Sequence, residues 1–166
     1  MSSMRVFAIY GFSKSGKTTT AVEIIKDLKQ RGYSVSTIKD IHVDDFTLDV
    51  VGKDTWRHWQ AGAEIVGIRT TNESTIMIKK PVGVFDLMEH FDTDYLILEG
   101  FRNIEIPKIL CAKNEKEIQE DMQKSVFCIA GVVSTQLSKY LNLPVVNAVT
   151  DVSRIVDIVE VCSLEL

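Results

Sequence analysis

The stretch GFSKSGKTTT, residues 11–20, constrains the fold of this 166-residue chain more than any other segment. Gly11, Gly16, Lys17 and Thr18 match the pattern G-x-x-x-x-G-K-[ST] in full. Glycines at these positions let the backbone curl tightly, so that successive N–H groups point inward at the start of a helix. Such a loop works only between a strand and a helix, so the motif predicts an α/β architecture.

The residues on either side of the loop have the required patterns. Residues 5–10 are a short apolar run, which is typical of a buried strand. Ala21, Ile24 and Leu28 recur at helical spacing, and residues 33–38 are rich in β-branched side chains. Strand, loop, helix and strand form one βαβ unit, which predicts a right-handed crossover and a parallel strand pair.

The rest of the chain continues this alternation without a repeat or a Pro/Gly-rich linker. We therefore expect one nucleotide-binding domain over residues 1–166, with a mostly parallel sheet, helices on both faces and the P-loop NTPase fold. The patterns predict further strands at residues 64–69, 75–79, 95–98, 108–112, 126–132 and 143–146, and helices at residues 54–62, 84–91, 115–124 and from 151 onward.

Composition excludes several classes of protein. The chain is 45% apolar and 25% charged, which is ample for a core and for solubility, and no apolar run approaches the roughly 20 residues of a membrane span. The first residues lack the pattern of a secretory signal, so we expect a cytoplasmic protein with no membrane partner. A net charge of −4 argues against broad nucleic-acid binding. The widely spaced Cys111, Cys128 and Cys162 are expected to be reduced thiols, and the three histidines lack metal-ligand spacing.

The loop predicts a cradle for nucleotide phosphates. Backbone amides and the helix dipole would hold the phosphates, Lys17 would reach the outer ones, and the Thr18 hydroxyl would bind Mg²⁺. The members of the loop expected to contact the nucleotide are Gly11, Ser13, Lys14, Ser15, Gly16, Lys17, Thr18 and Thr19.

Two more charged residues are expected at the same crevice. Glu99 ends the apolar strand 95–98 and is followed by Gly100. In open α/β sheets ligands lie at the carboxyl ends of the strands, so Glu99 should face the phosphates and bind the metal opposite Thr18. Lys39 ends the second strand and could neutralise phosphate charge, or it could be an ordinary surface lysine.

The irregular segment 41–54 is a third contributor. Asp49 and Gly52 have the D-x-x-G spacing at which nucleotide hydrolases place a metal-linked carboxylate and a γ-phosphate-sensing N–H. This pattern is short, and its position after the second strand is what makes it informative. Lys79 and Lys80, at the end of another strand, are expected to be a solubilising edge.

Together these residues resemble the molybdopterin-guanine dinucleotide biosynthesis protein B (MobB) family. The likeness rests on GFSKSGKTTT, on TIKD with the following acidic loop, on GKDTWRHWQAGA and on DYLILEGFRNIEIPKI. It covers the chain to about Lys108. GKDTWRHWQAGA is more specific than the phosphate loop, because this combination after an acidic loop is not general among nucleotide hydrolases.

The resemblance implies a GTP-binding homodimer that hydrolyses GTP slowly with Mg²⁺. It also implies an adaptor role beside the guanylyltransferase that joins GMP to molybdopterin. Carried over to this chain, Thr18, Asp49 and Glu99 surround the metal and Lys39 lies near the terminal phosphate. The family often has His where this chain has Asp40, and its His-rich loop is reduced here to His42.

Two other functions fit parts of the pattern. An ATP-dependent small-molecule kinase or ligase of the dethiobiotin-synthetase type shares the phosphate loop, the strand-ending lysine and the carboxylate–glycine pair. Kinases commonly bring several arginines to the phosphates, however, and here the arginines are scattered. A degenerate domain that binds only a protein partner would not need the intact loop. The guanine-reading N-K-x-D is absent, so a nucleoside triphosphate follows from chemistry and GTP from resemblance.

Overall fold

The computed structural model describes residues 3–43 and 46–166. Its backbone contacts divide the chain into two compact units. The first unit comprises Met1–Ile41 with Asp92–Leu166, and the second comprises His42–Phe91. The expectation of one domain over the whole chain stays a prediction. In the described ranges, no helix has both the length and the apolar character needed to cross a membrane.

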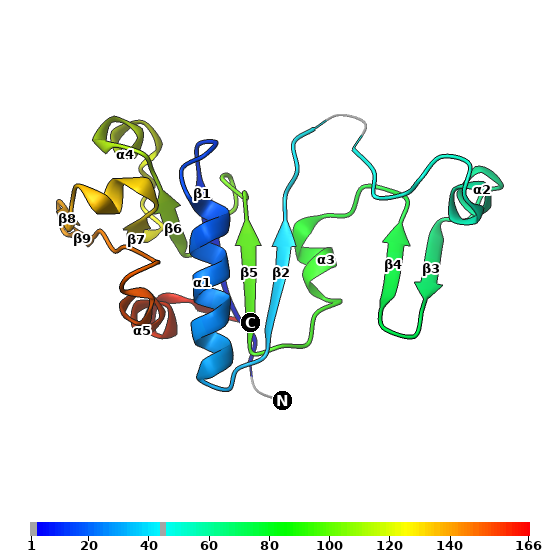
Figure 1. Ribbon diagram of the computed structural model, residues 1–166, viewed down its shortest axis with the longest axis horizontal. Helices are drawn as coiled ribbons and strands as arrows, with labels where there is room; N and C mark the ends of the chain where they lie inside the picture. The colour runs from blue at the N-terminus through cyan, green and yellow to red at the C-terminus, as the bar shows by residue number, and fades with distance from the viewer. Residues whose placement is uncertain (1–2, 44–45) are drawn as a thin grey trace. The chain divides into compact units, whose positions relative to one another are not determined.

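The first unit is built on a parallel sheet, as predicted (Figure 1). Its five parallel strands run in the order β2-β5-β1-β6-β7. Their carboxyl ends lie at one edge of the sheet, where the loop after β1 begins. The strands are β1 (Arg5–Gly11), β2 (Val35–Lys39), β5 (Tyr95–Glu99), β6 (Lys108–Cys111) and β7 (Val126–Ala130).

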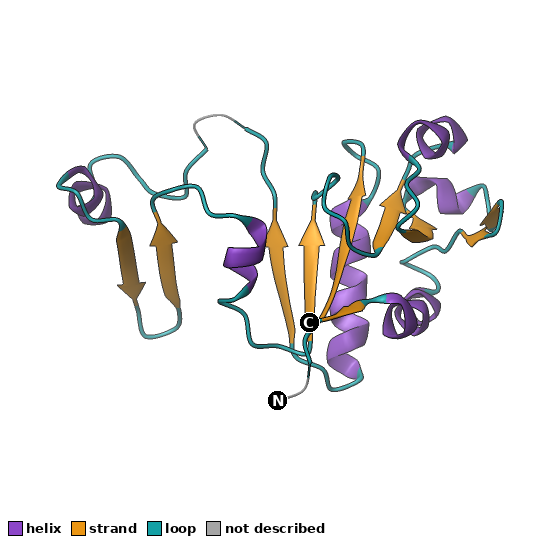
Figure 2. Ribbon diagram, turned by 180° about the vertical axis from the view of Figure 1, so that it is seen from behind, coloured by secondary structure: helices purple, strands orange, loops and turns teal. Residues whose placement is uncertain are grey.

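Two helices cover one face of this sheet, α1 (Lys17–Gln30) and α5 (Val152–Cys162) (Figure 2). The apolar positions of α1, which recur at helical spacing, point at the sheet, and Ile24 and Leu28 are fully buried. They pack with Phe7 and Ile9 of β1 and with the buried positions of α5. Burying this face anchors the helix that begins at the phosphate loop.

The other face of the sheet is covered at the β6–β7 side by α4 (Glu115–Asp121) and the 3₁₀ helix η1 (Val132–Thr135). Tyr10, Leu110 and Ile129 form the core beneath them. Asn114 caps α4 by accepting a hydrogen bond from the Glu117 N–H at 3.0 Å. Helices on both faces confirm the predicted architecture.

The end of the chain departs from prediction in its short strands. The expected strand 143–146 is instead β9 (Leu143–Pro144), which pairs antiparallel with β8 (Lys139–Tyr140). Contact with β7 continues through a bridge between Val145 and Ile129 and through the Val146 N–H, which donates to the Ile129 carbonyl oxygen at 2.9 Å. Pro144 has no N–H to donate, which limits a longer ladder. An unpredicted β10 (Leu164–Glu165) pairs with the start of β1.

The second unit contains α2 (Asp54–Gln60), an antiparallel hairpin of β3 (Ile65–Arg69) and β4 (Ser74–Ile78), and α3 (Val84–Met88). The hairpin is only two strands wide, so it has little core of its own. On one of its faces Ile65 and Ile76 are 60% and 73% exposed. α3 ends three residues earlier than the predicted helix 84–91.

Candidate nucleotide phosphate site

The loop between β1 and α1 has the backbone that a phosphate cradle needs. Gly11 and Gly16 have φ values of 140° and 99°. A Cβ at Gly11 would lie 1.9 Å from the Cys111 carbonyl oxygen, so a side chain cannot be accommodated there. Gly16 precedes the first residue of α1 and offers no side-chain cap, which leaves the first amides of the helix without a side-chain acceptor.

A cleft of 580 Å³ opens beside this loop at the carboxyl edge of the sheet. Residues from the loop, from the end of β2 and from the end of β5 meet around it. The structure therefore brings together most of the first-unit residues predicted for the site. The residues lining the cleft are Ser13, Lys14, Gly16, Lys17, Thr18, Thr19, Lys39, Asp40, Glu99, Gly100 and Val132.

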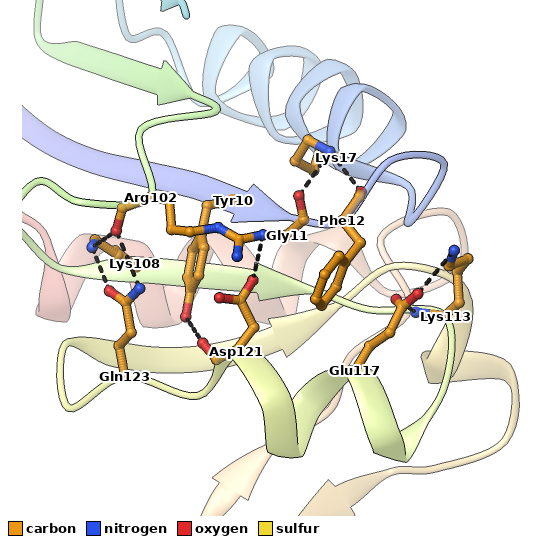
Figure 3. A network of polar contacts seen from close by, with 10 residues as sticks. All are labelled: Tyr10, Gly11, Phe12, Lys17, Arg102, Lys108, Lys113, Glu117, Asp121 and Gln123. Carbon is orange, nitrogen blue, oxygen red and sulfur yellow. Dashed lines mark hydrogen bonds and ion pairs between the residues drawn. The ribbon is translucent and has the colours of Figure 1, made fainter. Parts of the chain in front are cut away.

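Lys17 is held at the loop by main-chain oxygens (Figure 3). Its ammonium donates to the carbonyl oxygens of Gly11 at 3.1 Å and Phe12 at 2.7 Å. These acceptors are neutral, whereas a phosphate oxygen is charged and forms a stronger hydrogen bond with an ammonium. Lys17 is thus positioned at the loop and can exchange these partners for a phosphate.

Thr18, Lys39 and Glu99 converge on a single oxygen atom. The Thr18 hydroxyl donates to Glu99 Oε1 at 2.7 Å, and Lys39 Nζ lies 3.1 Å from the same atom. The convergence follows from register, since Lys39 and Glu99 are directly paired at the ends of β2 and β5. A hydroxyl and a carboxylate are ligands that Mg²⁺ accepts, so these two side chains fit the predicted metal.

Mg²⁺ at this position would depend on oxygens from a ligand as well. Within residues 3–43 and 46–166, no group of three or more His, Cys, Asp or Glu side chains could hold a metal. Mg²⁺ commonly binds through one or two protein oxygens together with substrate phosphates. The donor set of Thr18 and Glu99 matches that mode, and their role at a metal stays a prediction.

Asp49 and Gly52 belong to the second unit. The Asp49 carboxylate accepts hydrogen bonds from the Thr55 hydroxyl and from the Lys79 ammonium, each at 2.7 Å. The hydrogen bond from Lys79, with that from Thr55, holds the Asp49 pKa below its usual value. Lys79 is therefore part of a buried ion pair, and the expectation that it forms a solubilising edge is wrong. The metal role of Asp49 stays a prediction.

Sequence reasoning missed a charged network on the α4 side of the phosphate loop (Figure 3). The Arg102 guanidinium lies 5.0 Å from the centre of the Phe12 ring and 3.0 Å from Asp121 Oδ2. Phe12 is the second residue of the phosphate loop. Arg102 therefore connects the segment that follows Glu99 to both that loop and α4.

Lys108 completes this network from the first position of β6. It is 2% exposed, and its ammonium donates to the Arg102 carbonyl oxygen and to Gln123 Oε1, each at 2.6 Å. Burial lowers the pKa of Lys108 and raises that of Asp121. The one feature of the sequence that could have indicated this network is a lysine at the start of an otherwise apolar strand.

A smaller hollow of 180 Å³ shares Gly16, Thr19 and Val132 with the cleft. It is closed by the segment after β7 and by the turn at Asn147–Val149. The Val132 N–H donates to the Ser15 carbonyl oxygen at 3.1 Å, which ties this segment to the phosphate loop. No sequence motif indicated the hollow.

Cys111 and Cys128 are buried, free thiols of the first unit, as predicted. Burial raises the pKa of both thiols to about 12, so both are protonated at neutral pH. Cys111 lies beneath the phosphate loop, where its carbonyl oxygen limits the space at Gly11. These thiols therefore contribute packing.

Known sequences resemble this chain over most of its length. The family described as molybdopterin guanine dinucleotide synthesis protein B matches residues 6–135. A molybdopterin-guanine dinucleotide biosynthesis adapter protein of Haemophilus influenzae is 38% identical over 66% of this chain and 64% of its own length. A putative adapter protein of the same description from Methanocaldococcus jannaschii is 30% identical over 68% of this chain and 49% of its own length. The chain thus spans less than two thirds of each of these relatives.

Solved structures share the fold. A crystal structure of Bacillus subtilis MobB superposes with a TM-score of 0.79 at 22% identity, covering 97% of this chain and 99% of that one. A MobB homologue from Bacillus stearothermophilus gives 0.70 at 17% identity, covering 94% and 98%. Together with the sheet described above, these likenesses confirm the predicted α/β class with its P-loop NTPase fold.

Proposed function

The chain belongs to the molybdopterin guanine dinucleotide synthesis protein B family, and from this premise we propose that it binds GTP with Mg²⁺ and hydrolyses it slowly. We propose further that it is an adapter in molybdopterin guanine dinucleotide biosynthesis, working beside the guanylyltransferase of that pathway. The name adapter protein is carried by its relatives.

The observation that carries the nucleotide proposal is the convergence of loop, hydroxyl and carboxylate at one cleft. The amides at the start of α1 and the Lys17 ammonium would bind the phosphate oxygens. The Thr18 hydroxyl and Glu99 would hold Mg²⁺, which supplies positive charge at the phosphate oxygens. Lys39, at the end of β2, would lie at the terminal phosphate.

Slow hydrolysis is consistent with the environment of Glu99. The hydroxyl of Thr18 and the ammonium of Lys39 both contact the Oε1 atom of Glu99. A general base must lie within hydrogen-bond reach of the water that it activates, and this oxygen already has two donors beside it. The cleft is therefore better suited to holding a triphosphate than to activating a water molecule that attacks it.

The composition of the cleft favours this function over an ATP-dependent kinase or ligase. Among the described residues that line it, the cations are Lys14, Lys17 and Lys39, and none is an arginine. Arg102 follows Glu99 by three positions but is paired with Asp121. Small-molecule kinases commonly bring several arginines onto the phosphates, and the described lining of this cleft has none.

The test is calorimetric binding of GTP and ATP to the purified full chain, with and without Mg²⁺. We expect GTP to bind more tightly than ATP and Mg²⁺ to strengthen binding. The matched control is Lys29→Ala, an exposed lysine of α1 outside the cleft, which should bind as the wild type does. Equal affinity for the two nucleotides would remove the case for guanine, and tighter ATP binding with turnover of a small acceptor would favour the kinase.

A further inference from the structure

Lys14 occupies an unusual backbone conformation in the phosphate loop. Among the described residues, only Lys14 and Leu141 combine a side chain with a positive φ, and the value at Lys14 is 59°. The left-handed region is unfavourable for a residue with a Cβ, and glycine avoids this cost. A lysine at this position therefore lowers the stability of the loop relative to a glycine.

The charges around the cleft distinguish Lys14 from the other two lysines. Lys17 donates to two carbonyl oxygens, and Lys39 is paired with the Glu99 carboxylate at 3.1 Å. Lys14 also lines the cleft and is exposed, and it has no hydrogen bond or ion pair within the described part of the chain. Within the described residues, it is thus the lysine of the cleft whose ammonium is not bound by any protein group.

We propose that the Lys14 ammonium is a second phosphate-binding cation, which lets the cleft hold the polyphosphate chain of a nucleotide even without a metal ion. This inference rests on the proposed nucleotide function. The other loop residues act on phosphate through their backbone amides, whereas Lys14 acts through its side chain. Its three N–H donors and full charge replace part of the neutralisation that Mg²⁺ supplies.

The proposal gives the strained backbone a physical reason. In the left-handed conformation, the Cβ of Lys14 points in another direction than it would in a helix or a strand, and its long flexible side chain can adjust to a ligand. The loss of stability in the free protein is offset when the ammonium binds an anion. Because Lys14 is exposed, its contribution should also weaken as salt is added.

The experiment compares Lys14→Asn, Lys14→Gly and Lys14→Arg with the wild-type chain. Asparagine tolerates the left-handed region, so it removes the charge with little change to the loop. Glycine removes both charge and strain, and arginine retains the charge. Lys29→Gln, an exposed lysine of α1 outside the cleft, controls for net charge. Binding of GTP and of inorganic tripolyphosphate is measured by calorimetry, in EDTA and in Mg²⁺, and the thermal midpoint of each ligand-free variant is recorded.

We expect Lys14→Asn and Lys14→Gly to bind both probes about tenfold more weakly in EDTA, the size of one charge-assisted hydrogen bond. The loss should be smaller in Mg²⁺, and Lys14→Arg should stay within about twofold of the wild type. The thermal midpoint of Lys14→Gly should rise, because strain is removed.

Either of two results would overturn the inference about Lys14 and leave the proposed function intact. One is wild-type affinity in Lys14→Asn and Lys14→Gly. The other is a fall in the thermal midpoint of both variants, which would make Lys14 a structural part of the loop. If the wild type binds tripolyphosphate but not GTP, the proposed function fails. The role of Lys14 is then tested by the tripolyphosphate affinity of its variants. If it binds neither probe, both proposals fail.

Discussion

The two units of this chain differ in how they use their apolar residues. In the first unit, strands β1 and β5 are almost wholly buried, and Phe7, Ile9 and Leu96 have no exposed surface. In the second unit, the described hairpin leaves Ile65 and Ile76 mostly in water. The first unit can position charged side chains on a rigid sheet edge, whereas the second presents the kind of surface by which proteins associate.

The charged groups of the two units differ in their exposure to solvent. In the first unit, Glu99 and Lys39 meet at the mouth of a cleft, where a ligand can reach them. In the second, Asp49 and Lys79 form a pair whose side chains are 4% and 10% exposed. We infer that the first unit carries the nucleotide chemistry and that the second contributes to assembly.

The largest effect is expected from Lys17→Ala in the first unit. The variant loses the ammonium that is held at the loop by Gly11 and Phe12. Triphosphate affinity should fall by about a hundredfold or more, because charge-assisted hydrogen bonds to phosphate are lost. Calorimetry measures the change, with Lys26→Ala on the same helix as the control. Unchanged affinity would place nucleotide binding outside the first-unit cleft.

The next largest effect is expected from Ile76→Lys in the second unit. The family resemblance implies a homodimer, and if the hairpin takes part in it, Ile65 and Ile76 on one face of the paired strands would contact the partner. A lysine there should weaken dimerisation about thirtyfold, the size of a strong interface contact. Thr75→Lys, exposed on the opposite face, is the control. Analytical ultracentrifugation reports the dimer, and a wild-type monomer or an unaffected Ile76→Lys dimer would contradict this expectation.

A smaller effect is expected from Glu99→Gln. Glutamine keeps an oxygen for Thr18 but removes the charge that would hold Mg²⁺. Triphosphate binding should stay close to that of the wild type, while Mg²⁺-dependent hydrolysis falls about tenfold, at the low end of the effect of losing a group that supports a metal site. Phosphate release is measured across a Mg²⁺ titration, with Glu115→Gln on α4 as the control. Wild-type hydrolysis would move the metal role to another carboxylate, Asp49 first.

The same difference between units explains what the sequence could predict. The parallel sheet and the meeting of Thr18, Lys39 and Glu99 follow from local patterns, because strands that end together bring their last residues together. The pair between Arg102 and Asp121 depends on how one loop crosses the sheet, and no local pattern encodes that path. Lys79 was expected in solvent because its partner Asp49 is 30 positions away.

The smallest predicted effect is a pH dependence confined to the second unit. Lys79 and Thr55 hold the Asp49 pKa below its usual value of about 4. A carboxylate with a depressed pKa stabilises the folded state at pH values above its unfolded pKa, and this stabilisation is lost as the pH falls through the folded pKa. The second unit should therefore lose stability below about pH 4, and Asp49→Asn should lose less over that range.

Intrinsic fluorescence can isolate this effect, because both tryptophans of the chain, Trp56 and Trp59, lie in α2 of the second unit. Lys79 also lies 4.9 Å from the centre of the Trp59 ring, so the probe is next to the ion pair. Urea unfolding followed by fluorescence from pH 6 to pH 3 tests the prediction. Glu64→Gln, which removes an exposed pair with Lys80, should follow the wild-type pH profile. If Asp49→Asn also follows the wild-type profile, the ion pair with Lys79 contributes nothing to the fold of the second unit, and Asp49 would be better explained as a residue kept for the metal.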